Sequence, residues 1–271
     1  MLRDITLGQY YQVNSRLHRL DPRVKLFATF IYIISLFLFK NMTAYFIAGL
    51  WLFLVIKMSK VPFQFMVKGL KPVMMILLLT VICNMLFTKG TPIVSIWKIT
   101  ITYEGLKMAL FMTIRFVMLI VGSTIMTLTT TPNQLTDGLE SILSPLKKLN
   151  VPVHEVAMMM SIALRFIPIL MEETDKIMKA QIARGADFES GNLFKRVKAM
   201  LPILIPLFVS AFRRANDLAM AMEARCYRGG DGRTKMKPLI YKIEDKKALI
   251  CVVFYLLILV AGGIVGNYLP I

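Results

Sequence analysis

The sequence predicts an all-α membrane protein with about five transmembrane helices and a cytosol-facing block of about three further helices. Hydrophobic residues make up 56% of the 271 residues, and the mean hydropathy is +0.63. Soluble domains contain only about 45–50% apolar residues. Lys and Arg outnumber Asp and Glu by 33 to 16, and an excess of basic residues is typical of the cytosolic side of membrane proteins.

Five apolar runs are candidates for transmembrane helices, which need about 20 mostly apolar residues to cross a bilayer. These runs are Val24–Phe39, Thr43–Ile56, Pro72–Phe87, Leu106–Thr130 and Ala248–Leu269. The residues before the first run are polar and lack the short apolar core of a cleavable signal peptide. Membrane insertion is therefore expected to begin with the first span.

The basic residues orient these spans. With the N-terminus in the cytosol, only Lys40, Lys89 and Lys98 lie in outer loops, whereas nineteen Lys or Arg residues fall between positions 131 and 247. This arrangement follows the positive-inside rule. The sequence thus predicts a multi-pass protein with a cytoplasmic N-terminus and an outer C-terminus.

The same topology divides the chain into three parts. Residues 1–130 form an N-terminal cytosolic segment with four spans, residues 131–247 a cytosolic helical block, and residues 248–271 the final span. Two apolar runs inside the block, Val156–Met171 and Met200–Phe212, are predicted not to span. The first contains Arg165 and a proline, and the second has only thirteen residues.

Turn residues divide the block into three predicted helices. One helix is expected to begin near Thr131-Pro132-Asn133, a second near Asn150-Val151-Pro152 and a third near Gly191-Asn192, because such residues are typical of helix starts and turns. Glycines at 229, 230 and 232 end the block.

Two predicted helices of the block end in similar sequences, Ala183-Arg184-Gly185 and Ala224-Arg225-Cys226, each within Ala-x-x-Ala-Arg. Arginine is common near helix C-termini because its charge complements the helix dipole, and this explanation suffices for either arginine alone. The repeated sequence context on the cytosolic side instead favours two arginines that each anchor a partner subunit. A guanidinium that enters an acidic groove forms charge-assisted hydrogen bonds.

No catalytic residue, metal site or bound cofactor is predicted. The sequence contains no phosphate-binding loop, no HExxH and no Gly-x-Ser-x-Gly, so ATP hydrolysis and the common hydrolytic reactions are not expected. The interiors of the spans hold no Asp or Glu, which ion-coupled carriers use at membrane depth. Arg115 is deep in a span, and both structural pairing and contact with a partner remain open for it. Nucleic acid is not an expected partner.

Three sequence landmarks resemble one family, the transmembrane (T) component of energy-coupling factor (ECF) transporters, also known as the EcfT/CbiQ family. They are the stretch Ile5–Tyr11 followed by His18–Leu26, the stretch Ala163–Pro168, and the two x-Arg-x motifs. Together they cover nearly the full chain.

This resemblance implies a subunit of an ECF-type ABC importer for vitamins or other micronutrients in the cell membrane of a prokaryote. Two ABC ATPase subunits, which use ATP and Mg²⁺, would dock at Arg184 and Arg225 through Ala183, Gly185, Ala224 and Cys226. One or several substrate-binding membrane subunits (S components) would contact the block's helices, which then act as coupling helices. The expected contact surface comprises Met159, Met160, Ala163, Pro168, Met171 and Met178.

The methionines have two explanations, ordinary helix packing or a thioether surface that repacks against different partners. Two other functions also compete with the coupling subunit. An autonomous permease or channel would move solute without ATPases, and a membrane scaffold would bind acidic partners without transport.

Overall fold

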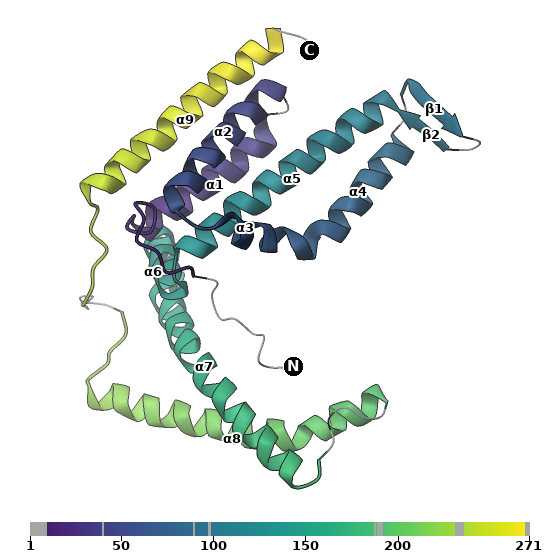
Figure 1. Ribbon diagram of the computed structural model, residues 1–271. Helices are drawn as coiled ribbons and strands as arrows, with labels where there is room; N and C mark the ends of the chain where they lie inside the picture. The colour runs from purple at the N-terminus through teal and green to yellow at the C-terminus, as the bar shows by residue number, and fades with distance from the viewer. Residues whose placement is uncertain are drawn as a thin grey trace. The chain divides into compact units, whose positions relative to one another are not determined.

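The computed structural model describes residues 10–39, 41–88, 90–96, 99–186, 188, 192–230 and 236–268. The chain divides into two compact units. The larger unit comprises Gly8–Gly138 and Leu239–Ile271, and the smaller unit comprises Leu139–Pro238 with Met1–Leu7. The described residues are mainly helical (Figure 1), which confirms the predicted all-α class.

Four long helices form the centre of the larger unit: α1 (Pro22–Leu38), α2 (Met42–Ser59), α5 (Tyr103–Thr129) and α9 (Ile243–Tyr268). Helix α5 contacts α1 and α2, and α9 packs against the same two helices. The last span thus returns to the first two, although some 180 residues of chain separate them.

Aromatic side chains join these helices in the core. Trp51 of α2 stacks on Tyr255 of α9 with 4.9 Å between the ring centroids, and the Tyr255 hydroxyl lies 2.7 Å from Ser35 Oγ of α1. Arg115, deep in α5, donates from Nε to the Tyr45 hydroxyl at 2.6 Å. The structure therefore gives this arginine a pairing partner within the larger unit.

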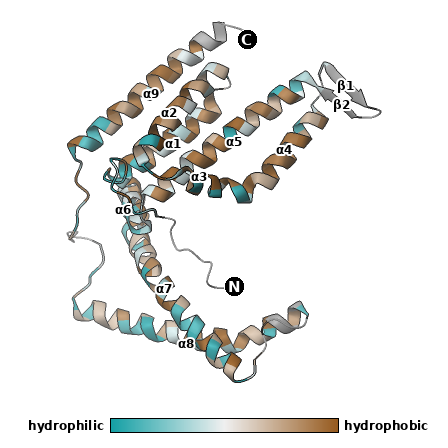
Figure 2. Ribbon diagram, viewed as in Figure 1, coloured by the Kyte–Doolittle hydropathy of each residue, from teal (hydrophilic) through white to brown (hydrophobic). Residues whose placement is uncertain are grey.

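A second helical layer covers one side of α5. Helix α3 (Phe63–Leu70) continues through a 3₁₀ turn (Lys71–Val73) into α4 (Met74–Phe87), and both α3 and α4 contact α5. Helix α4 is apolar almost throughout (Figure 2), yet Leu77 is its only buried residue. Its outer side chains, such as Met75 at 83% exposure, fit a lipid environment.

A short β-hairpin, which was not predicted from the sequence, connects α4 to α5. Strands β1 (Pro92–Ile96) and β2 (Ile99–Thr102) pair antiparallel. Beside it, the carboxylate of Glu104 accepts a 2.7 Å hydrogen bond from the Thr91 backbone N–H. The Thr102 side chain caps α5 by accepting from Gly105 N, as expected of an N-cap threonine.

Five described helices are long and apolar enough to cross a membrane, the number that the sequence predicted. Four of them contain or overlap predicted spans: Met42–Ser59, Phe63–Phe87, Tyr103–Thr129 and Ile243–Ile264. The fifth is Val153–Ala183, which contains the run Val156–Met171 that the sequence predicts not to span. The predicted first span corresponds to α1, whose 17 residues reach about 26 Å at 1.5 Å per residue, slightly less than a hydrocarbon core of about 30 Å.

The smaller unit contains the end of α6 (Pro132–Leu143), a 3₁₀ segment (Ser144–Leu149), α7 (Val153–Ala183) and α8 (Leu193–Ala224). The helix starts coincide with the three turn signals in the sequence. Helices α7 and α8 contact each other and cross (Figure 1). Both continue through internal prolines, Pro168 in α7 and Pro202 and Pro206 in α8.

Candidate functional site

The first predicted arginine motif forms the C-terminus of α7. Arg184 is the C-cap residue, and Gly185 follows with a φ of +85°. The Gly185 N–H donates to the Ile182 carbonyl at 2.9 Å, and the Ala186 N–H donates to the Gln181 carbonyl at 3.0 Å. This pair of bonds defines a Schellman motif, in which a left-handed residue satisfies the last carbonyls of the helix.

The second motif forms the C-terminus of α8 with the same geometry. The Cys226 N–H donates to the Glu223 carbonyl at 2.9 Å, and the Tyr227 N–H donates to the Met222 carbonyl at 3.0 Å. Cys226 has a φ of +54°, which is uncommon for a residue other than glycine. Arg225 therefore occupies the same C-cap position as Arg184.

Both arginines are exposed, and neither forms an ion pair with another described residue. Each carries its positive charge where the helix dipole is negative, which stabilises the folded helix end. Ala183, Gly185, Ala224 and Cys226 are also exposed. The two motifs thus present two free guanidinium groups, each beside small side chains, at two separate helix ends of one unit.

Within the smaller unit, an ion pair joins α7 to α8, and a close contact joins the segment after α8 to the first turn of α7. Arg214 of α8 lies 3.2 Å from the carboxylate of Glu173 on α7. After α8, Gly230 lies against the ring of His154 in the first turn of α7, where an added Cβ would collide with ring atom Cδ2. His154 in turn bonds the Glu140 carboxylate at 2.9 Å.

The predicted contact surface on α7 is only partly exposed. Met159, Met160, Ala163 and Pro168 are exposed, whereas Met171 and Met178 are half-buried.

A larger exposed apolar surface lies on α8, and none of its residues belongs to the contact surface predicted from the sequence. Phe208 and Phe212 form a ring pair at 4.7 Å and are 66% and 56% exposed. Their spacing of four residues, which places side chains on one helix face, was the available signal.

A second polar cluster lies in the larger unit, where the landmark His18–Leu26 meets the start of α9. Asp21 caps α1 by accepting from Arg23 N, and the Asp21 N–H donates to Asp245 Oδ1 at 2.7 Å. The Lys25 ammonium donates to the carbonyls of His18 and Thr129. This landmark therefore ties the N-terminal loop, α1, α5 and α9 together. The earlier landmark begins at residue 5, and its residues 5–9 lie outside the described residues.

His18 is a hydrogen-bonding residue of this cluster. Its Nε2 donates to the Tyr11 carbonyl at 3.0 Å, and its Nδ1 lies 2.7 Å from the Ser15 hydroxyl. Burial lowers the pKa of His18, the Tyr11 carbonyl partly offsets this change, and the positive charge of Lys25 reinforces it. The neutral imidazole is thus the form that the fold favours.

The described residues contain no group of three or more His, Cys, Asp or Glu that could hold a metal ion.

Comparisons with known proteins agree on one family. The model of the family described as "CbiQ: Cobalt transport protein" matches residues 13–236. A protein of Clostridium kluyveri named energy-coupling factor transporter transmembrane protein EcfT is 54% identical, with 93% of this chain and 94% of that protein covered. A protein of Bacillus subtilis with the same name is 50% identical, with 93% and 96% covered.

Proposed function

Because the chain belongs to the CbiQ family and to its branch of energy-coupling factor transporter transmembrane proteins, we propose that it couples two ATPase subunits to a substrate-binding membrane subunit. ATP and Mg²⁺ would be used by the partner subunits, and this chain would transmit their motion. The transported substrate would be a vitamin or another micronutrient captured by the S component.

The observation that carries this proposal is the shared geometry of the two arginine motifs. Arg184 and Arg225 hold the same C-cap position in two Schellman motifs, and both are exposed. Two equivalent anchors suit two similar partners. Each hydrogen bond between a guanidinium and an acidic groove would contribute about 1.5–3 kcal/mol.

The test is co-purification of both ATPases with the Arg184→Ala/Arg225→Ala variant in native membranes. We expect normal insertion of the variant and loss of ATPase binding. The matched control, Lys176→Ala/Arg213→Ala, removes one exposed cation from the body of each helix and should keep the ATPases. Retained assembly and uptake in the arginine double variant would contradict the proposal.

The exposed apolar residues of α7 and α8 would form the contact with the S component. This surface would comprise Met159 and Met160 of α7 together with Phe208 and Phe212 of α8, all of which are exposed. A Phe208→Ser/Phe212→Ser variant should retain the ATPases but lose the S component on purification. Loss of both partners together would instead indicate that α8 has unfolded.

The competing functions predict different results in reconstituted vesicles and in cells. The chain reconstituted alone should not move solute, and uptake should appear only with both ATPases, the S component and ATP. Uptake by the chain alone would favour an autonomous permease or channel. Normal micronutrient uptake by cells that lack the gene would favour a scaffold.

We also propose that α7 lies on the cytosolic side, although its length and composition suit a span. If α7 crossed the bilayer while α8 did not return, the basic residues that follow α7 would lie outside, against the positive-inside rule. The variant Lys176→Cys, with Cys83, Cys226 and Cys251 replaced by alanine, tests this topology. A membrane-impermeant maleimide should label it in inside-out vesicles but not in intact cells.

A further inference from the structure

We propose that the larger unit contains a binding site for one anionic phospholipid, with the phosphate near Arg16 and Lys247 and an acyl chain among α1, α2, α5 and α9. The site is a cavity of about 670 Å³. Pockets that hold small organic ligands have volumes of about 300–1,000 Å³. Residues that line this one come from the N-terminal loop and the four central helices.

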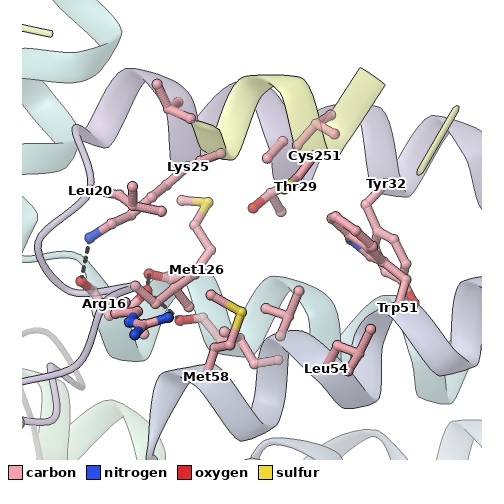
Figure 3. A pocket seen from close by; sticks show the side chains of 18 of the residues that line it. Arg16, Leu20, Lys25, Thr29, Tyr32, Trp51, Leu54, Met58, Met126 and Cys251 are labelled. Carbon is pink, nitrogen blue, oxygen red and sulfur yellow. Dashed lines mark hydrogen bonds between the residues drawn. The ribbon is translucent and has the colours of Figure 1, made fainter. Parts of the chain in front are cut away.

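The two ends of the cavity differ in chemistry (Figure 3). Arg16 and Lys25 lie at one end, and Tyr32 and Trp51 lie at the other, with Met58, Met126 and Cys251 between them. The cavity is therefore charged where α1 and α9 begin and apolar toward the middle of the helices. A lipid has the same polarity along its length, with a charged headgroup at the membrane boundary and acyl chains inside.

The charged end favours an anion. Arg16, Lys25 and Lys247 contribute three positive charges to the lining and Glu244 contributes one negative charge, which leaves a net charge of +2. Arg16 and Lys247 are exposed, and neither pairs with another described residue. Lysine and arginine side chains bind phosphate through charge-assisted hydrogen bonds, and basic residues near a membrane surface attract anionic lipids.

The apolar part favours an acyl chain over water. A cavity with few polar groups holds water poorly, since a bound water needs two to four polar partners. If the cavity were empty, the side chains that line it would lack the dispersion contacts that neighbouring atoms normally supply. Leu54 and Met58 in the lining are both 48% exposed, so the cavity is open, and a chain from the surrounding bilayer can enter it.

The test is native mass spectrometry of the full chain released from nanodiscs that contain equal amounts of phosphatidylglycerol and phosphatidylcholine. The wild type should retain one phosphatidylglycerol in preference to phosphatidylcholine. Arg16→Gln/Lys247→Gln should lower this retention about tenfold or more, because each basic residue near the surface contributes about 1 kcal/mol to binding an anionic lipid. The matched control, Arg19→Gln/Lys246→Gln, removes the same charge from adjacent exposed positions outside the lining and should bind like the wild type.

A second measurement follows the acyl chain rather than the headgroup. Cys251 lines the cavity, and Cys83→Ala/Cys226→Ala leaves it as the single cysteine. Phosphatidylglycerol should slow maleimide labelling of Cys251 several-fold, whereas glycerol phosphate without acyl chains should not. Equal lipid retention by the two double variants, equal retention of both lipids, or unchanged labelling of Cys251 would each overturn the proposal.

Discussion

Replacement of Asp245 by alanine should destabilise the larger unit more than any other single change at the start of α9. Its side chain is 2% exposed. One carboxylate oxygen accepts from Asp21 N and the other from Lys242 N, both at 2.7 Å. Hydrogen bonds to a charged group contribute about 1.5–3 kcal/mol each. Because Lys242 is exposed and water can replace its bond, we expect a loss of about 3 kcal/mol, mainly from the buried Asp21 N–H.

Thermal unfolding in mild detergent measures this effect. A loss of about 3 kcal/mol corresponds to a fall in Tm of about 6–12 °C for a chain of this size. Asp245→Asn, which keeps one acceptor oxygen, should lose about half as much. The control is Glu244→Ala, which removes an exposed carboxylate from the same helical turn and should cost less than about 1 kcal/mol. If both alanine variants melted at the same temperature, Asp245 would not stabilise the contact between α9 and the start of α1.

Three further predictions test the geometry. Residues 226 and 185 both have positive φ, where a side chain is strained. Cys226→Gly should therefore stabilise the chain by about 1 kcal/mol, and Gly185→Ala should destabilise it by a similar amount. Denaturant unfolding would show changes of opposite sign in the free energy of unfolding. The lowered pKa of His18 makes the unfolded chain bind more protons, so stability should fall as the pH drops below 6.5, and His18→Asn should flatten this dependence in melting curves at pH 5.5–7.5. Gly122→Ala would bring its Cβ to 2.7 Å from a tyrosine ring of α1 and should cost about 1–3 kcal/mol, whereas Gly49→Ala, 3.4 Å from a flexible methionine end, should melt like the wild type.

The sequence predicted the helices well because their signals are local. Spans depend on the length and composition of one segment, and helix starts depend on local residues such as Pro132, the first residue of α6, and Pro152, the N-cap of α7. The sequence predicted a span at α1 and none at α7, whereas helix length and composition favour α7 over α1. Helix α1 is short but buried on one side, and α7 is long and apolar yet carries Arg165. Length and composition therefore favour α7 as a span, whereas the distribution of basic residues favours α1.

The candidate site, the two arginine motifs, could be predicted only because the same short motif occurs twice in the sequence. Ala-x-x-Ala-Arg located both helix ends, but it gave no sign that Cys226 adopts the left-handed conformation of Gly185, since cysteine has no preference for positive φ. The bond between Asp21 and Asp245 joins residues 224 positions apart, and one sequence without its fold contains no signal for such a pair.

The first turn of α1 explains why the landmark around Asp21 joins so many parts of the larger unit. The chain leaves this unit after Gly138 and returns to it at Leu239. A Cβ at Gly138 would lie 3.3 Å from Pro22 Cβ, and the Arg23 guanidinium donates to the Leu239 carbonyl at 2.7 Å. The last residue before the departure and the first after the return therefore both contact adjacent residues of one helical turn. Because contiguous packed contacts can carry energetic coupling, we expect a displacement of the chain at either point to act first on α1 and next, through the bond from the Asp21 N–H to Asp245, on α9.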